Sequence, residues 1–179
     1  MKRRARRFAE KAHRGQKRKN RDIPYVTHPI RVAEQLERNG FPEELVCAAY
    51  LHDVAEDTAY TVEDIRVEFG DRVASLVEAH TEDKSKSWKE RKQHTIHTLK
   101  FSDKEIKYLI VADKLDNLLG LEQDLAEQGE RIWDNFNAGY EEQKWYNESI
   151  AEHMYEGLID EDVPHYFYEF EETVKRVFR

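Results

Sequence analysis

The stretch AAYLHDVAEDT, residues 48–58, places four ionisable side chains directly after an apolar run. His52 and Asp53 are adjacent, and Glu56 and Asp57 follow them one helical turn later. An imidazole nitrogen beside a carboxylate oxygen suits a divalent ion such as Mn²⁺, Fe²⁺ or Zn²⁺. Carboxylates near such an ion, but not bound to it, could orient or deprotonate an attacking water. Taken alone, the stretch is also consistent with a helix end whose charges interact with the helix dipole and cap the next element.

Two distant positions favour a metal site. His28 precedes a proline at the junction between a loop and a helix, where the proline ring fixes the backbone. Asp113 lies within the apolar run LIVADKL, and a buried carboxylate is costly unless it is paired or bound to a cation. Asn117 follows Asp113 by four residues, on the same helix face. We therefore predict a ligand set of two histidines and two aspartates, consisting of His28, His52, Asp53 and Asp113.

The elements that must position these residues are helices. Apolar residues recur at helical spacing along nearly the whole chain, and no period-two run with a hairpin turn signal is present, so we predict an all-α fold. Thr27, Thr61 and Ser102 are the expected N-caps, Thr61 with Asp64 in a capping box. The expected helices span residues 5–15, 27–39, 43–54, 61–69, 71–80, 90–99, 102–125, 133–159 and the segment after 164, with polar loops at 15–29 and 81–90.

Composition narrows the class of protein. The chain has 179 residues, of which 37% are charged, and its net charge is −8. No run of 18 apolar residues is present, so we expect no transmembrane helix. A single cysteine, Cys47, and the lack of an apolar N-terminal signal predict a reducing compartment, the cytoplasm.

The charge is unevenly distributed. Residues 1–21 hold 11 lysines and arginines and one acid, Glu10, so the remainder of the chain is strongly acidic. Such a basic segment is typical of binding to nucleic acid or to a phosphorylated small molecule. We assign residues 17–21 to phosphate binding and leave residues 2–7 as either a helix surface or a nucleic-acid contact.

The order and spacing of these motifs resemble a known family. The segments HRGQKRKNRDIPYVTHPIRVA, LHDVAEDT, FGDRVASLV and ADKLDN are similar to those of the HD superfamily of metal-dependent phosphohydrolases. Within it, they resemble the hydrolase domain of bifunctional alarmone synthetase/hydrolases and the stand-alone small alarmone hydrolases. TEDKSKSWKERK resembles a loop of the metazoan-type stand-alone enzymes. The resemblance covers residues 5–146.

This resemblance implies a fold and a site. The fold would be an HD-domain helical bundle with a metal site in its core cleft, formed by residues 1–150. Residues 151–179 would be a C-terminal helical extension, packed on the domain or at an oligomer interface. One Mn²⁺, or another divalent ion, would be held by the two histidines and two aspartates, and Glu56 and Asp57 would activate the attacking water. The implied substrate contacts are Arg18, Lys19, Asn117, Lys84, Lys86 and Lys144.

The implied reaction removes the 3′-pyrophosphate of guanosine 3′,5′-bis(diphosphate), ppGpp or pppGpp, and leaves GDP or GTP. Residues 20–22 and 118–120 depart from the family pattern at substrate contacts, not at metal ligands. The alternative is therefore an HD-fold phosphatase that acts on another nucleotide, such as NADPH at its 2′-phosphate. A non-catalytic nucleotide or nucleic-acid binder is a third hypothesis, which the intact ligand set and acidic pair argue against. We expect a phosphorylated guanosine nucleotide as partner, and neither a membrane nor a nucleic acid; the oligomeric state stays open.

Overall fold

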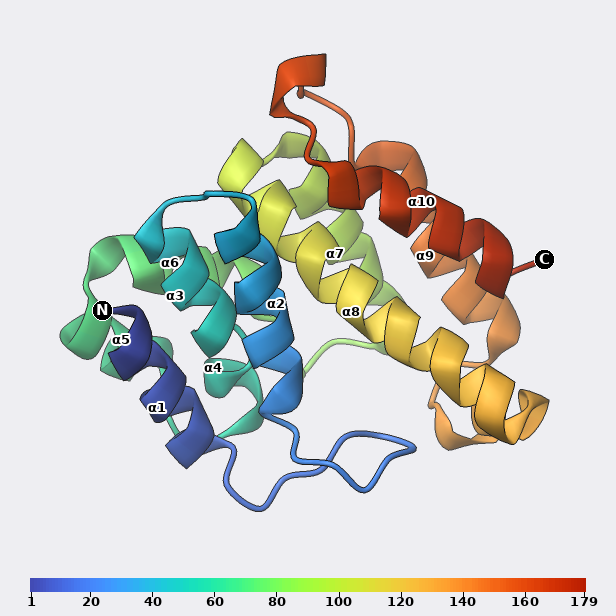
Figure 1. The fold of residues 1–179 in the computed structure, drawn as a ribbon, viewed down its shortest axis with the longest axis horizontal. Coiled ribbons are helices and arrows are strands. Elements are labelled where there is room, and N and C mark those ends of the chain that lie inside the picture. Colours follow the sequence, from blue (N-terminus) through green and yellow to red (C-terminus); the bar gives the residue numbers. More distant parts are fainter. The chain divides into compact units, whose positions relative to one another are not determined.

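The computed structural model describes residues 1–179 and confirms the all-α prediction. The chain forms two compact units, residues 1–82 and 83–179, which we call the first and second units (Figure 1). None of the helices is both long and apolar enough to span a bilayer. The expected division at residue 150 stays a prediction.

The first unit is built around α3. This helix is apolar on all sides and buried from Leu45 to Leu51, as expected of a helix at the centre of a core. Helices α1, α2 and α6 pack against it, and α5 packs on α6. The bounds of the helices are α1 Lys2–Ala12, α2 Thr27–Arg38, α3 Glu43–Leu51, α4 Val54–Asp57, α5 Val62–Phe69 and α6 Asp71–His80.

The predicted helix over residues 43–54 is interrupted. Helix α3 ends at Leu51, α4 begins at Val54, and His52 and Asp53 form the turn between them. His52 Nδ1 donates to the carbonyl oxygen of Ala49 at 2.6 Å, so this side chain is held against the last turn of α3. The turn places two adjacent polar residues at the end of a buried helix, where a continuous helix would have directed them about 100° apart.

Two of the three predicted N-caps are wrong. The capping box of α5 is confirmed: Thr61 Oγ1 accepts from the Asp64 amide at 3.2 Å, and Asp64 Oδ2 accepts from the Thr61 amide at 2.8 Å. Thr27 is instead the first residue of α2, and its hydroxyl donates to the Pro24 carbonyl oxygen at 2.8 Å. Ser102 precedes the actual N-cap of α8, which is Asp103.

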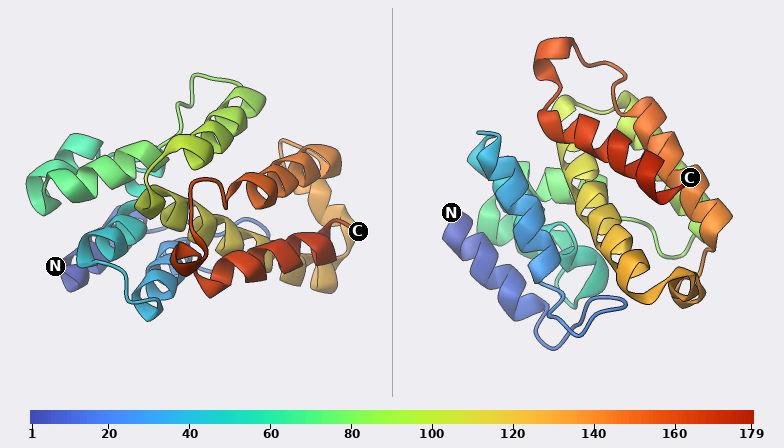
Figure 2. Two further views of the ribbon diagram at one scale, coloured as in Figure 1. Left: turned by 90° about the horizontal axis from the view of Figure 1, so that it is seen from above. Right: turned by 45° about the vertical axis from the view of Figure 1, so that its right-hand side comes forward.

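The second unit is organised along α8, its longest helix. Helix α10 packs along α8 and α9, and α7 packs on α9 and α8 (Figures 1 and 2). The expected last helix, after Pro164, is confirmed as α10. The bounds are α7 Trp88–Phe101, α8 Lys104–Gln128, the 3₁₀ helix η1 Glu130–Asn135, α9 Tyr140–His153, the 3₁₀ helix η2 Asp160–Asp162 and α10 His165–Val177.

The predicted helix over residues 133–159 is wrong. Aromatic residues continue at helical spacing through this segment, but η1 ends at Asn135 and α9 begins only at Tyr140. The intervening sequence FNAG contains asparagine and glycine, which favour turns over helix interiors. Helix α7 also begins two residues earlier than expected, because Ser87 Oγ accepts from the Glu90 amide at 3.2 Å and caps it.

Candidate metal centre

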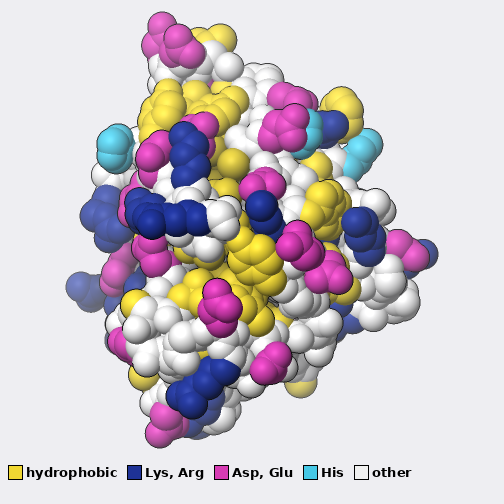
Figure 3. All heavy atoms as spheres, turned by 90° about the vertical axis from the view of Figure 1, so that its right-hand side faces the viewer, with side chains coloured by type: hydrophobic (Ala, Val, Ile, Leu, Met, Phe, Trp, Pro, Cys, Tyr) yellow, Lys and Arg dark blue, Asp and Glu magenta, His cyan; other side chains and the backbone are white.

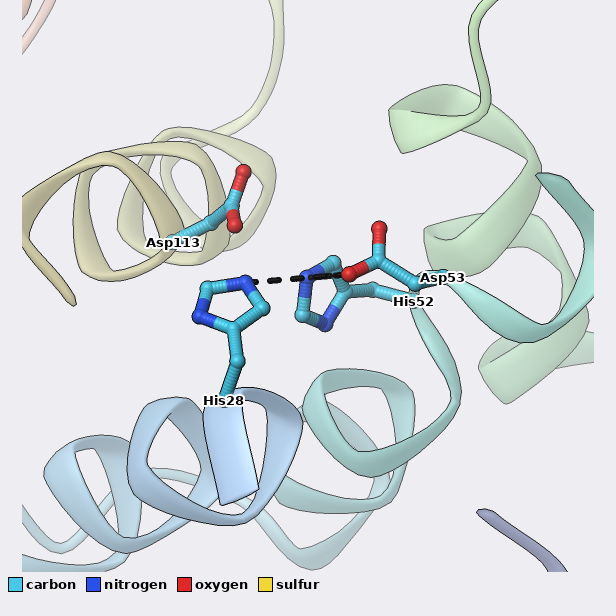
Figure 4. Close-up of side chains that lie close together, drawn as sticks. All are labelled: His28, His52, Asp53 and Asp113. Atoms are coloured by element: carbon cyan, nitrogen blue, oxygen red, sulfur yellow. Dashed lines mark ion pairs between the residues drawn. The ribbon is translucent and has the colours of Figure 1, made fainter. Parts of the chain in front are cut away.

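Three of the predicted ligands converge in the first unit. His28 lies in the first turn of α2, and His52 and Asp53 form the turn after α3. Asp53 Oδ2 lies 3.1 Å from His52 Nε2 and 3.7 Å from His28 Nε2. Figure 4 draws these side chains, together with Asp113 of the second unit. We call His28, His52 and Asp53 the His-Asp cluster.

The His-Asp cluster is deeply buried. His28 is 1% exposed, His52 is 0% exposed and Asp53 is 7% exposed. The two imidazole rings meet edge to face, with centroids 5.2 Å apart. Ligand atoms of the three residues all lie within 4.8 Å of one another. Burying a carboxylate and two imidazoles together is costly unless they are well paired or share a cation.

The orientation of His52 suits metal binding. Because the Ala49 carbonyl oxygen can only accept, the proton of the neutral ring lies on Nδ1. That bond leaves the lone pair of Nε2, the nitrogen closest to Asp53, available for an ion. Two imidazole nitrogens and a carboxylate oxygen match the preferences of borderline divalent ions. The cluster therefore fits a divalent metal site.

A second group of acids shares one member with the cluster. Asp53, Glu56 and Asp57 also bring one carboxylate oxygen each within 4.8 Å of the others. Glu56 is half-buried and Asp57 is exposed, whereas Asp53 is buried. We call Glu56 and Asp57 the acidic pair. The short helix α4 thus holds two acids beside a predicted metal ligand and within reach of solvent.

The fourth predicted ligand belongs to the second unit. Asp113 lies on α8 and is 3% exposed. Lys114 Nζ lies 2.9 Å from its Oδ2, and Asn117 Nδ2 donates to its Oδ1 at 3.4 Å. Asp113 is therefore a buried carboxylate with polar partners on its own helix, as the apolar run around it predicted.

The predicted substrate contacts are divided between the units. Arg18 and Lys19 lie in the first unit, in the loop between α1 and α2, and the guanidinium carbon of Arg18 is 5.6 Å from the centroid of the Tyr25 ring. Lys84 and Lys86 are exposed in the loop before α7. Lys144 is half-buried on α9, and Asn117 is exposed on α8. Their roles stay predictions.

Three residues near the site were missed by the sequence reasoning. The Tyr25 hydroxyl donates to Asp53 Oδ2 at 2.6 Å. Gln16 Nε2 donates to the main-chain oxygen of Asp57 at 2.8 Å. The His80 ring meets the His52 ring with centroids 5.0 Å apart. Each contact joins residues 28 or more positions apart, so no local pattern could have indicated it.

The single cysteine takes no part in this chemistry. Cys47 is buried in α3, and burial raises the pKa of its thiol to about 11. A thiol with this pKa is protonated at neutral pH, and the thiolate is the form that attacks substrates or binds metals. Cys47 is therefore a core residue.

The comparisons with known proteins agree with this geometry. A family model described as an HD domain matches residues 5–141. The human protein named guanosine-3′,5′-bis(diphosphate) 3′-pyrophosphohydrolase MESH1 is 39% identical over 117 residues, which are 64% of this chain and 65% of that protein. The chain spans less than two thirds of the length of such curated relatives.

Two solved structures share the fold over most of the chain. A crystal structure of a protein from Listeria monocytogenes is 48% identical, with a TM-score of 0.81, and the match covers 87% of this chain and 96% of that one. A structure described as "A metazoan ortholog of SpoT hydrolyzes ppGpp and plays a role in starvation responses" is 29% identical, with a TM-score of 0.80, and the match covers 98% of this chain and 94% of that one.

Proposed function

The chain belongs to the HD-domain family, and on this premise we propose that it is a metal-dependent phosphohydrolase that removes the 3′-pyrophosphate of ppGpp or pppGpp. The products would be GDP or GTP and pyrophosphate. The observation that carries this proposal is the buried His-Asp cluster, with Asp53 shared between it and the acidic pair. The relatives named for ppGpp hydrolysis support the choice of substrate.

We propose that His28, His52, Asp53 and Asp113 hold one divalent ion, and that this ion is Mn²⁺. The two imidazoles would supply nitrogen ligands and the two aspartates oxygen ligands, a donor set that suits Mn²⁺. When bound, the ion supplies a water of lowered pKa and positive charge against the phosphoryl oxygens. The buried position of all four side chains keeps them in place without competition from bulk water.

The acidic pair would orient the attacking water and accept its proton. Glu56 and Asp57 lie on α4, one helical turn after the two ligands of the α3–α4 turn. A carboxylate at this position can accept a proton as the water attacks phosphorus, and the second carboxylate can orient that water. Their partial exposure leaves space for the substrate to approach them.

The loop between α1 and α2, which we call the basic loop, would compensate the negative charge of the substrate. The chain has a net charge of −8, so a highly charged anion needs local cations to approach the acidic site. Arg18 and Lys19 lie in the same unit as the His-Asp cluster, and the planar guanidinium of Arg18 can stack on a guanine base. We propose Asn117, Lys84, Lys86 and Lys144 as further contacts to the ribose and phosphates. A single buried cysteine supports a cytoplasmic location.

The test is product analysis with a panel of nucleotides. Purified protein with Mn²⁺ would be incubated separately with ppGpp, pppGpp and NADPH, and the products separated by anion-exchange chromatography. GDP with pyrophosphate from ppGpp, at a higher kcat/KM than release of phosphate from NADPH, is the expected result. Absence of turnover of ppGpp and pppGpp, under conditions where a known hydrolase acts, would contradict the proposal.

The loop at residues 20–22 is the reason for including NADPH. Asn20 adopts a left-handed backbone with φ of 67°, and Asp22 pairs with Lys17 at 3.0 Å. Because Asp22 forms an ion pair with one of the loop's lysines, less positive charge is available to a pyrophosphate group. If NADPH is the better substrate, the second candidate, a nucleotide 2′-phosphatase on the same site, replaces the first.

A further inference from the structure

The loop between α1 and α2, residues 13–26, is built around the ring of Tyr25. The Tyr25 amide donates to the Gln16 carbonyl oxygen at 2.8 Å, and Lys17 and Pro24 form an isolated β-bridge, so the two sides of the loop are joined at its base. The Tyr25 ring packs on the rings of both His13 and His28, with centroid distances of 5.0 Å and 6.0 Å. The ring is thereby fixed by the packing of its neighbours.

The hydroxyl of this fixed ring reaches a predicted metal ligand. It donates to Asp53 Oδ2 at 2.6 Å, and Oδ2 is also the oxygen that lies 3.1 Å from His52 Nε2. A carboxylate oxygen has two lone pairs, so it can accept from a phenol and still bind an ion. A single hydrogen bond from a rigid donor restricts rotation of the Asp53 carboxylate about its χ2 torsion.

The same loop contacts the acidic pair through Gln16. His13 Nδ1 donates to Gln16 Oε1 at 2.8 Å, and Gln16 Nε2 donates to the Asp57 main-chain oxygen at 2.8 Å. His13 is only 2% exposed, so the chain of bonds starts from a buried anchor. The loop that carries Arg18 and Lys19 is therefore attached to the site at two places.

We propose that Tyr25 is a positioning residue that orients the Asp53 carboxylate for metal binding and couples the basic loop to the metal centre. The inference rests on the proposed function for the identity of the site, but its first consequence concerns binding of the metal alone. Partners that orient a metal ligand typically contribute 10- to 100-fold to metal affinity. Tyr25 also contacts Arg18, whose guanidinium carbon lies 5.6 Å from the ring centroid, so the basic loop and the metal ligand share one support.

Two substitutions distinguish the role of the Tyr25 hydroxyl from the role of its ring. Tyr25→Phe keeps the packing with His13 and His28 and removes only the bond to Asp53. We expect the Kd for Mn²⁺, measured by electron paramagnetic resonance on the full chain without nucleotide, to rise roughly 10- to 100-fold. At saturating Mn²⁺, KM for ppGpp should stay at the wild-type value. Tyr25→Leu should also raise KM by roughly two- to fivefold, because the face that supports Arg18 is lost.

The matched control is Tyr60→Phe. Tyr60 is half-buried in the same unit, and its ring packs on Phe8 with centroids 4.7 Å apart. This variant removes a hydroxyl of the same kind away from the cluster, and its Kd for Mn²⁺ should equal that of the wild type. Circular dichroism on all variants shows whether each has folded.

The outcomes distinguish the two proposals. If the wild type binds Mn²⁺ but does not hydrolyse ppGpp, the proposed function fails, while the comparison of Tyr25→Phe with Tyr60→Phe still decides the role of Tyr25. If Tyr25→Phe binds Mn²⁺ as tightly as the wild type, or if it loses its helical signal, the hydroxyl is not a positioning group and the inference is wrong. A wild type that binds no Mn²⁺ overturns it as well.

Discussion

Three buried polar side chains of the second unit are paired differently from the three residues of the His-Asp cluster in the first unit. In the second unit, Lys107, Asn147 and Thr173 are all buried, and each donates to a main-chain oxygen: Lys107 to Leu99 and Lys100 at 2.5 and 3.1 Å, Asn147 to Gln143 at 2.8 Å, and Thr173 to Glu169 at 2.7 Å. In the first unit, the buried His28, His52 and Asp53 instead face one another. Polar groups that satisfy backbone atoms serve the fold. Polar groups gathered around a common point are placed so that they could share a cation.

One face of the molecule carries hydrophobic, acidic and basic side chains together. Figure 3 shows hydrophobic side chains at the centre of one face, with acidic and basic side chains interspersed around them. Two cations of α1 pair with acids of the first unit: Lys2 with Glu37, and Arg6 with Glu10 at 3.1 Å. Exposed pairs of this kind contribute little to stability. The comparison that bears on function is therefore between the buried polar side chains described above, not between surface charges.

The largest effect should come from removing the shared carboxylate. Asp53→Ala deletes one ligand and the residue common to the cluster and the acidic pair, so we expect loss of measurable Mn²⁺ binding and of hydrolysis. The loss should exceed the roughly 100-fold limit typical of residues that only orient a ligand. Isothermal titration with Mn²⁺ and a ppGpp assay measure both. In the absence of metal, Asp53→Ala should unfold at a temperature close to that of the metal-free wild type.

Asp71→Asn is the control for this variant, because Asp71 is an exposed acid of the same unit. Full metal binding and activity are expected of it. Activity retained in Asp53→Ala would show that the His-Asp cluster is not the metal centre.

The acidic pair should affect turnover and not metal binding. In Glu56→Gln and Asp57→Asn, the loss of the residue that takes the proton should lower kcat by roughly 10²- to 10⁴-fold. The Kd for Mn²⁺ should stay near the wild-type value in both variants. Steady-state kinetics at saturating Mn²⁺ measure this, with Glu68→Gln, an exposed acid on α5, as the control. Equal kcat values in all three variants would leave the acidic pair without a catalytic role.

The buried lysine of the second unit should affect stability and not chemistry. Lys107 is 2% exposed, and its ammonium donates to two carbonyl oxygens at the end of α7. Lys107→Met keeps most of the volume but leaves those oxygens without this donor, which should cost about 1–3 kcal/mol in the free energy of unfolding. In a chain of this size, each kcal/mol corresponds to a fall in Tm of roughly 2–4 °C.

Thermal unfolding followed by circular dichroism measures that loss. Lys104→Met is the matched control, because Lys104 is an exposed lysine of the same helix whose Asp162 partner lies at 3.3 Å on the surface. If Lys107→Met abolished Mn²⁺ binding without changing Tm, the contrast between the two units would fail.

The smallest effect concerns the capping box of α5. Thr61→Ala removes a hydroxyl that accepts from the Asp64 amide and should destabilise the protein by about 1 kcal/mol. Thr61→Ser keeps a capping oxygen and should restore most of that loss. Urea unfolding detects the difference. Equal midpoints for Thr61→Ala and the wild type would show that the cap contributes nothing to the first unit.

Much of the first unit could be predicted from sequence. The grouping of His28, His52 and Asp53 was predicted because two adjacent ionisable residues follow an apolar run, and because the order of the three along the chain fits a family of metal hydrolases. Their role as ligands stays a prediction. The all-α fold followed from helical periodicity, and the α5 cap followed from a local pattern of four residues. In each case, the signal lies within a few positions along the chain or in a specific combination of motifs.

What sequence could not supply depends on contacts between distant positions. Tyr25 is an ordinary loop residue until the fold brings its hydroxyl to Asp53, 28 positions away. The break between α3 and α4 coincides with a hydrogen bond from the His52 side chain to the Ala49 carbonyl oxygen, whereas the local pattern favours continuation. In the second unit, the helical spacing of aromatic residues through 133–159 predicted one continuous helix and gave no sign of the turn before α9.

The metal dependence of ppGpp hydrolysis is the most direct test of the proposed metal centre. The chain of 179 residues would be stripped of metal with EDTA, dialysed, and then incubated with ppGpp, with or without added Mn²⁺, while ³¹P nuclear magnetic resonance follows the phosphates. We predict no reaction without metal and, on addition of Mn²⁺, loss of the 3′-diphosphate signals with appearance of GDP and free pyrophosphate. Equal turnover by the stripped protein, or release of single phosphates in place of pyrophosphate, would contradict this prediction.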